Sequence, residues 1–223
     1  MRRSVWIPLA RFWKSDESLS LLLALLVVVT LVLPAVVPSR ASPGPLAIAL
    51  FSGMLVAGAL TIGRQKRWFG RAVATLCLLA VPGPWIAMQW PSEALLAWNA
   101  ATEAMVLVLL GIVVLATVLR AGTITRRQIQ GAVAAYLLFG LAWAAAYEWL
   151  SLHDPGAFTG NIVPGSHQWT YYSLVTLTTM GYGDITPVHP AARSLAVAEA
   201  LTGQLYVAIL IGRLVALELQ ARK

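Results

Sequence analysis

Long apolar stretches alternate with short polar connections along the chain. A helix that crosses a lipid bilayer needs about twenty mostly apolar residues. Six stretches meet this requirement: residues 19–37, 45–62, 71–90, 94–119, 128–150 and 190–217. Pro82-Gly83-Pro84 interrupts the third stretch, because proline breaks or kinks a helix. The pattern predicts an all-α membrane protein with six transmembrane helices.

The composition of the 223-residue chain also indicates a membrane protein. Apolar residues make up 59% of it and charged residues 11%, whereas about a quarter of a soluble domain is charged. A single soluble core could not cover so many apolar stretches. The only cysteine, Cys77, lies inside an apolar stretch, which excludes an intrachain disulfide and a metal site built from cysteines.

The basic residues, which give a net charge of +7, gather before the first apolar stretch and in every second connection. Such residues mark the cytoplasmic side of membrane proteins. The residues that follow this pattern or close the chain are Arg2, Arg3, Arg11, Lys14, Arg64, Lys66, Arg67, Arg71, Arg120, Arg126, Arg127, Arg222 and Lys223. The other connections carry only Arg40 and Arg193. We therefore expect both termini in the cytoplasm, residues 151–189 outside, and a plasma membrane of the bacterial type. Clusters separated by apolar stretches do not form one phosphate-binding face, so the expected partners include membrane lipids and no nucleic acid.

Residues 1–18 admit two interpretations. A basic segment before an apolar stretch resembles a signal peptide. However, the stretch 19–37 is longer than the usual signal core, and Pro38-Ser39-Arg40-Ala41 is a poor cleavage site. We expect a retained helix after a cytoplasmic or interfacial N-terminus that contains Trp6 and Trp13.

The connection between the fifth and sixth stretches holds the candidate chemistry. Residues 166–178 are too short and too polar to span a bilayer, and they predict a re-entrant helix that enters from outside and stops halfway. Non-helical backbone at that depth is tolerated only where it lines a water-filled cavity or is buried in protein. The segment that follows reads Thr178-Thr179-Met180-Gly181-Tyr182-Gly183-Asp184.

The two glycines of this segment can adopt backbone conformations that other residues avoid. Alternated with Met180 and Tyr182, they allow successive carbonyl oxygens to point to one side of an extended strand. Several such strands around an axis would form rings of oxygens that replace the hydration shell of a cation, with the hydroxyl of Thr179 at the cytoplasmic end. One chain supplies one strand and no internal repeat supplies another, so the sequence predicts a closed symmetric oligomer.

Residues 178–184 resemble the signature of the potassium channel family, and the similarity extends over residues 128–217, about two-fifths of the chain. The resemblance implies a homotetramer around a central pore, with K+ as the permeant ion and no organic cofactor. From the sequence we expect no ligand-binding domain. It implies a selectivity-filter loop supported by Thr178 and Asp184. The K+ ligands in that filter would be Thr179, Met180, Gly181, Tyr182 and Gly183.

Residues around the loop match the family as well. Tyr171 and Tyr172 stand where the family carries an aromatic pair that packs as a cuff around the filter tyrosine, here Tyr182. Gly203 falls where the inner helix of the family has its gating hinge. By the same correspondence, the water-filled cavity would be lined by Gln204, Val207 and Ile211.

The chain departs from the family at two positions. Met180 replaces the commoner valine, which keeps the carbonyl and changes the packing behind the filter. Val175 stands where some bacterial relatives have a glutamate that shares a proton with the filter aspartate. Asp184 therefore needs another donor, and Tyr171 and Trp169 are the candidates.

Glu199 lies inside the last apolar stretch, four residues before Gly203. A carboxyl group within a membrane is costly and points to a functional role. Two interpretations stay open. The side chain is either protonated or hydrogen-bonded behind the re-entrant helix, where it supports Thr176 or Ser173, or it lies near the cavity, titrates and gates.

Residues 19–120 resemble the four-helix voltage sensor of voltage-gated cation channels without its charges. Moving one charge through the membrane field is worth about 2.3 kcal/mol per 100 mV, and the stretch 94–119 contains no arginine or lysine, only Glu103. We therefore expect little voltage dependence. The remaining chain is expected to form a pore domain at residues 128–217 and a short cytoplasmic tail at residues 218–223.

The predicted function is passive, potassium-selective conduction, with a less selective cation channel as the alternative. A membrane transporter or enzyme with a chance Gly-Tyr-Gly-Asp is the alternative from another class. The sequence shows neither clustered catalytic side chains nor the paired broken helices of a repeated transporter fold. No enzyme is therefore expected.

Overall fold

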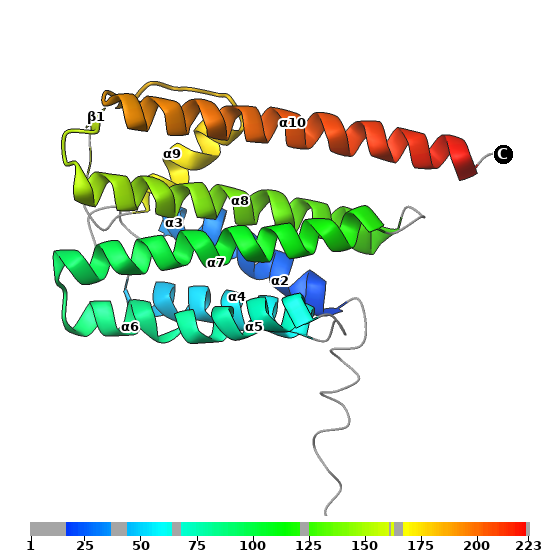
Figure 1. The fold of residues 1–223 in the computed structure, drawn as a ribbon, viewed down its shortest axis with the longest axis horizontal. Coiled ribbons are helices and arrows are strands. Elements are labelled where there is room, and N and C mark those ends of the chain that lie inside the picture. The colour runs from blue at the N-terminus through cyan, green and yellow to red at the C-terminus, as the bar shows by residue number, and fades with distance from the viewer. Residues whose placement is uncertain are drawn as a thin grey trace, which may run out of the picture.

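The computed structural model describes residues 17–36, 44–63, 68–120, 125–160, 162 and 167–221. Almost all of them are helical (Figure 1). The elements are α2 (Glu17–Val27), the π-helical turn η1 (Val28–Val32), α3 (Leu33–Val36), α4 (Pro45–Gly63), α5 (Trp68–Ala80), α6 (Pro82–Gln89), α7 (Glu93–Arg120), α8 (Arg126–His153), β1 (Phe158–Gly160), α9 (Gln168–Leu177), β2 (Ile185–Pro187) and α10 (Pro190–Ala221).

Among the described residues, six helices are long and apolar enough to cross a membrane, which confirms the predicted all-α membrane fold. They cover Leu19–Val36, Pro45–Ile62, Trp68–Gln89, Glu93–Leu119, Arg126–His153 and Pro190–Gln220. The third is broken where expected, since α5 ends at Ala80 and α6 begins at Pro82. In α8 a capping box fixes the start, because Thr125 and Gln128 bond each other's backbone amides.

The two strands were not predicted. They pair in antiparallel fashion, with Thr159 opposite Thr186 and Gly160 opposite Ile185. Each strand has three residues, which is too short to leave an alternating pattern in the sequence. We call the end of the molecule that carries β1 and β2 the ribbon end.

Helices α7 and α8 run antiparallel through the middle of the molecule, with α2, α4, α5 and α6 on one side and α9 and α10 on the other (Figure 1). One apolar core joins α8 to the helices before it. Its most buried members include Leu22, Leu26, Met54, Leu55, Leu107, Leu110 and Leu138. A second core at the ribbon end joins α8 to α9, α10 and both strands. It contains Tyr147, Phe158, Trp169, Tyr172, Ile185 and Ala192.

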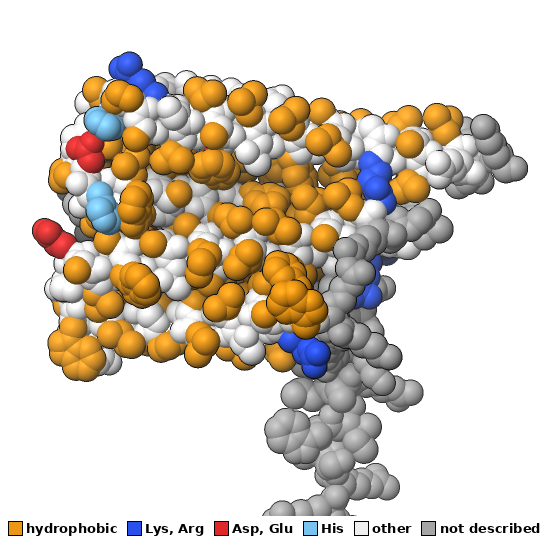
Figure 2. All heavy atoms as spheres, viewed as in Figure 1, with side chains coloured by type: hydrophobic (Ala, Val, Ile, Leu, Met, Phe, Trp, Pro, Cys, Tyr) orange, Lys and Arg blue, Asp and Glu red, His pale blue; other side chains and the backbone are white. Residues whose placement is uncertain are grey.

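Charged side chains gather at the two ends of the visible face, and apolar side chains cover the middle (Figure 2). The carboxylates and histidines in view lie at the ribbon end, whereas the basic side chains lie mainly at the opposite end. This separation fits a body that crosses a membrane. Several segments discussed from the sequence lie outside the described residues. They are residues 1–16 with Trp6 and Trp13, the segment 38–41, the basic residues Arg64, Lys66 and Arg67, and Arg222 with Lys223.

Candidate functional site

Helix α9 is a ten-residue helix that lies between α8 and α10 and ends inside the molecule (Figure 1). The amides of the next three residues close its last turn, since Thr178, Thr179 and Met180 donate to carbonyl oxygens of α9 at 2.9–3.0 Å. The carbonyl of its last residue, Leu177, accepts a hydrogen bond from the Tyr136 hydroxyl of α8 at 3.3 Å. The carboxyl end of α9 is therefore held in place by its own chain and by α8.

The backbone of residues 178–184 follows α9 and alternates in conformation. The φ angles of Thr179, Gly181 and Gly183 are +58°, +57° and +79°, while Met180 and Tyr182 between them keep the ordinary negative sign. Among the described residues, Thr179 is the one non-glycine with positive φ, a conformation that a β-branched residue adopts only under constraint. A φ that changes sign from one residue to the next allows successive carbonyls to turn toward the same side of the strand. All seven residues are exposed in the single chain.

The far end of this segment is fixed by the β-ribbon. Gly160 has a φ of +130°, and a Cβ at that position would overlap the carbonyl oxygen of Asp184. The hydroxyls of Thr159 and Thr186 lie 2.7 Å apart across the ribbon. Both ends of the alternating segment are thus anchored, one by α9 and the other by β1.

Of the two donors considered for Asp184, the structure supplies Tyr171. Desolvation first, and then the hydrogen bond from its hydroxyl to the Asp184 carboxylate, raise the pKa of Tyr171. Trp169 is instead 4% exposed and packs on Phe158, with ring centroids 4.9 Å apart.

Helix α10 passes beneath the start of the alternating segment. Gly203 is buried there, and a Cβ on it would overlap the carbonyl oxygen of Leu177 and reach its carbonyl carbon at 3.0 Å. The next residue, Gln204, donates from Nε2 to the hydroxyl of Thr179 at 3.1 Å. Val207 and Ile211 follow at helical spacing and are exposed. The close contact with Leu177 explains why a glycine stands at position 203 without any bend in the helix. Because α10 continues unbroken through Gly203 to Ala221, the role of Gly203 as a hinge stays a prediction.

The family model described as "Ion channel" matches residues 134–218. The segment that runs from α8 to α10 is therefore similar to the ion-channel family over most of its length, and we refer to this segment as the pore domain. Its matched relatives include two proteins named as potassium channels. Because the family model and these relatives are ion channels, the expectation that the chain is not an enzyme is confirmed. The apolar helices and this family make the chain a membrane protein.

The relatives match the pore domain over part of their length. The "Two pore potassium channel c" of Oryza sativa subsp. japonica is 40% identical over 84 residues, which are 36% of this chain and 17% of that protein. The "Inward rectifier potassium channel Kirbac3.1" of Paramagnetospirillum magnetotacticum is 35% identical over 72 residues, 32% of this chain and 22% of that one. "Protein LctB" of Geobacillus stearothermophilus is 39% identical over 62 residues, 28% of this chain and 46% of that one. The chain thus covers less than half the length of each, and no solved structure matches it.

The aromatic cuff around Tyr182 is not formed within one chain of the pore domain. Tyr172 is buried and packs on Tyr147, with ring centroids 4.8 Å apart, whereas Tyr182 is 64% exposed. Helical geometry explains the difference, because Trp169 and Tyr172 are three residues apart and share one face of α9. Tyr171 lies on another face and is exposed beside Asp184.

Glu199 has no exposed surface, so its carboxyl does not face a cavity. Its two oxygens lie 2.5 Å from the hydroxyls of Ser173 and Tyr147. Thr176, the other partner considered from the sequence, donates to the carbonyl of Tyr172 at 2.8 Å instead. Tyr147 was not recognised from the sequence, because nothing there relates it to a glutamate 52 residues later.

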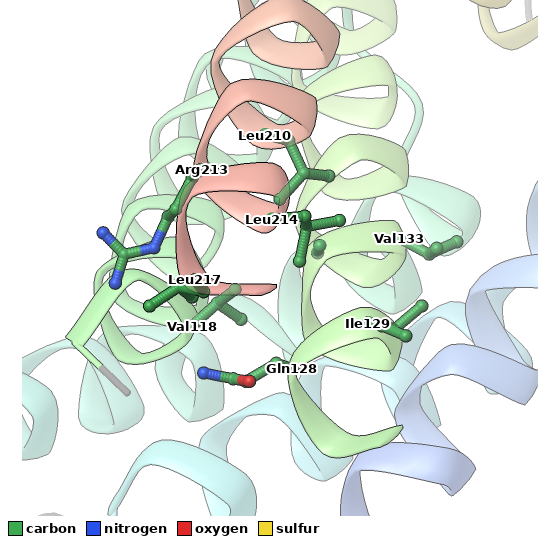
Figure 3. Close-up of a pocket in the computed structure, with 9 residues that line it drawn as sticks. Val118, Gln128, Ile129, Val133, Leu210, Arg213, Leu214 and Leu217 are labelled. Atoms are coloured by element: carbon green, nitrogen blue, oxygen red, sulfur yellow. The ribbon is translucent and has the colours of Figure 1, made fainter. Parts of the chain in front are cut away.

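Helix α10 comes close to the carboxyl-terminal part of α7 beside a small pocket (Figure 3). Leu210, Leu214 and Leu217 of α10 line this pocket together with Val118 of α7 and Ile129 of α8. Arg213 donates to the carbonyl of Leu119 near the end of α7. An arginine is favourable there because the last carbonyls of a helix lack partners and carry partial negative charge.

Within the described residues, no three His, Cys, Asp or Glu side chains are grouped to hold a metal ion. His189 and Asp154 form a pair at 3.8 Å near the ribbon, and both are substantially exposed. Residues 178–184 carry a row of exposed backbone oxygens and the hydroxyls of Thr178 and Thr179.

Proposed function

We propose that four copies of this chain form a potassium-selective channel that conducts K+ passively. The observation that carries the proposal is the alternating sign of φ at residues 179–183. This backbone directs the carbonyls of one segment to one side, so four segments around an axis would present stacked rings of oxygens to a dehydrated cation. Potassium-channel relatives of the same pore domain support K+ as that cation.

Each residue of the proposed selectivity filter has a separate part. Gly181 and Gly183 permit the left-handed conformation at low steric cost. Met180 and Tyr182 contribute their carbonyls while their side chains point away from the axis. Thr179 adds its hydroxyl at the end nearest Gln204. The carboxyl end of α9, with its partial negative charge, favours a cation in the space below.

The exposed surface of the single chain supports a tetramer. Helix α10 has few buried residues, and large apolar side chains remain exposed along it. Apart from Val207 and Ile211, they include Val197, Leu201, Leu205, Ile209, Val215 and Leu219. Tyr182 is also exposed, although tyrosine side chains usually pack against neighbours. Neighbouring copies around a closed ring would cover this surface and complete the cuff around each Tyr182.

In the proposed channel the ribbon end faces outward and both termini are cytoplasmic, in a bacterial-type plasma membrane. The distribution of basic residues supports this orientation. Below the filter, Gln204, Val207 and Ile211 would line the cavity, because they follow Gly203 on exposed parts of α10. Residues 19–120 would form a sensor-like unit without gating charges, since α7 carries no basic residue before Arg120.

A flux assay tests the proposal. The protein is reconstituted in liposomes loaded with K+ or with Na+, and the flux down each gradient is compared with that of empty liposomes. We expect K+ flux with little Na+ flux, and chemical cross-linking should trap four chains. Equal K+ and Na+ flux would replace the proposal with the less selective cation channel, and cross-linked species no larger than dimers would contradict the tetramer.

A further inference from the structure

We propose that Glu199 is a neutral carboxylic acid whose O–H donates a hydrogen bond to the hydroxyl oxygen of Ser173. We propose further that this hydrogen bond positions α9 behind the filter. The description of α9 as lying behind a filter rests on the proposed function. The protonation of Glu199 follows from the local geometry alone. Glu199, Ser173 and Tyr147 come from α10, α9 and α8, and each has essentially no exposed surface.

Two short contacts meet at the hydroxyl of Ser173. Its Oγ lies 2.5 Å from Oε1 of Glu199 and 2.6 Å from the carbonyl oxygen of Gly140. Two oxygens at such a distance need a proton between them. A serine hydroxyl carries one proton and a carbonyl oxygen carries none, so Ser173 can supply only one of the two contacts.

The third oxygen pair uses the hydroxyl proton of Tyr147. Tyr147 donates to Oε2 of Glu199 at 2.5 Å, and a phenol has one proton to give. The second proton at Ser173 must therefore come from the carboxyl group itself. With Glu199 protonated, Ser173 donates to Gly140 and accepts from Glu199, and every contact is satisfied. With Glu199 ionised, two acceptors would face each other without a proton.

The surroundings of Glu199 also disfavour a charge. The titratable groups near it are tyrosines, namely Tyr147 and Tyr136 of α8 and Tyr172 of α9. No basic side chain of the described residues is among the groups that act on the carboxyl. A buried carboxylate without a cationic partner is costly, and the neutral acid avoids that cost.

The hydrogen bond lies where it can hold the filter in place. Ser173 is in the middle of α9, and Gly140 lets α9 approach α8 so closely that a Cβ there would reach Leu174 at 3.1 Å. One turn beyond Glu199, Gly203 abuts the carbonyl of Leu177. Helix α10 therefore contacts α9 at two points one turn apart, a proton-dependent one at Glu199 and a steric one at Gly203. Glu199 is a positioning residue, and loss of its proton at high pH would release the first contact.

Substitutions at Glu199 separate the neutral acid from a carboxylate. In Glu199→Gln the amide oxygen can accept from Tyr147 and the amide nitrogen can donate to Ser173, so the variant reproduces the neutral acid and cannot ionise. We expect Glu199→Gln to retain the wild-type melting temperature of the assembled protein and the wild-type K+ flux. At high pH both quantities should fall in the wild type and stay unchanged in Glu199→Gln. Glu199→Leu, which cannot donate, should lose both at every pH.

Infrared difference spectroscopy measures the proton directly. The carbonyl stretch of a protonated carboxyl should disappear in Glu199→Gln at neutral pH and remain in the control Glu93→Gln, whose side chain is exposed at the start of α7. If Glu199→Gln fails to assemble, Tyr147→Phe should shift the same band, since it removes one hydrogen bond from that carboxyl. A band that neither substitution changes would overturn the proposal, and so would an assembled Glu199→Gln variant whose thermal stability falls at high pH as that of the wild type does. These readouts do not depend on ion flux, so a protein that conducts no K+ would refute the proposed function without deciding the state of Glu199.

Discussion

Replacing Gly203 with alanine places a methyl group against the last carbonyl of α9. The clash involves the backbone oxygen and carbon of Leu177, which cannot rotate away as the end of a side chain can. Either α10 or the carboxyl end of α9 must shift. Gln204 would then move relative to Thr179, to which it now donates at 3.1 Å.

The size of the effect can be worked out with a second glycine of the same helix. Overpacking by a methyl group costs about 1–3 kcal/mol, while alanine in a helix is favoured over glycine by about 0.5–1 kcal/mol. Gly212 has no atom within 4 Å of the position of a Cβ. Gly212→Ala therefore gains the helix term alone, and the difference between the two variants isolates the clash at roughly 1–3 kcal/mol.

The assay is thermal stability in detergent, followed as the fraction of assembled protein that survives heating on a size-exclusion column. For a chain of this length 1 kcal/mol corresponds to roughly 2–4 °C in Tm, so Gly203→Ala should melt about 2–12 °C below Gly212→Ala. Equal Tm values for the two variants would refute the reasoning. If Gly203→Ala lowered channel opening with no loss of Tm, the hinge would be the better explanation of this glycine.

Three further predictions concern conduction. Gly181→Ala requires alanine at a φ of +57°, which costs about 1–2 kcal/mol, and it should abolish selective K+ flux. The control Gly53→Ala should conduct normally, because the added methyl group meets no atom within 4 Å. Selective K+ flux in Gly181→Ala would be inconsistent with the proposed filter. Gln204→Leu removes the amide that donates a hydrogen bond to Thr179, and such a bond is worth about 0.5–1.5 kcal/mol. The K+ concentration for half-maximal flux should therefore change roughly two- to tenfold. An unchanged concentration would argue against a role of Gln204 at the innermost ion site. Because α7 lacks gating charges, conductance in planar bilayers should vary little with voltage, and a curve as steep as that of a voltage-gated channel would disprove this.

Much of the fold could be predicted because membrane helices leave a strong signal. A run of about twenty apolar residues needs no partner to be recognised, and proline and the capping residues of α8 determine two of the helix boundaries within a few residues. The alternating backbone followed from the glycines at positions 181 and 183, since few residues tolerate positive φ. That signal is local, and it survives in a single sequence.

Features that depend on contacts between distant segments could not be predicted. The β-ribbon joins residues 158–160 to residues 185–187, and each strand is too short to show a pattern. The partners of Glu199 come from two other helices, so the sequence could offer Ser173 only as one of two choices and gave no sign of Tyr147. The cuff assigned to Tyr171 and Tyr172 by correspondence stays a prediction, because within one chain Tyr172 packs on Tyr147 and a neighbouring copy would have to supply the contact with Tyr182.

The central claim is that residues 178–184 of four chains select K+. The most direct test is the reversal potential of the reconstituted channel with K+ on one side of a planar bilayer and Na+ on the other, and then with a tenfold K+ gradient. For a K+-selective pore the reversal potential should follow the K+ gradient at about 59 mV per tenfold change and should stay there when Na+ is added to either side. A reversal potential near zero with K+ opposite Na+ would contradict the account.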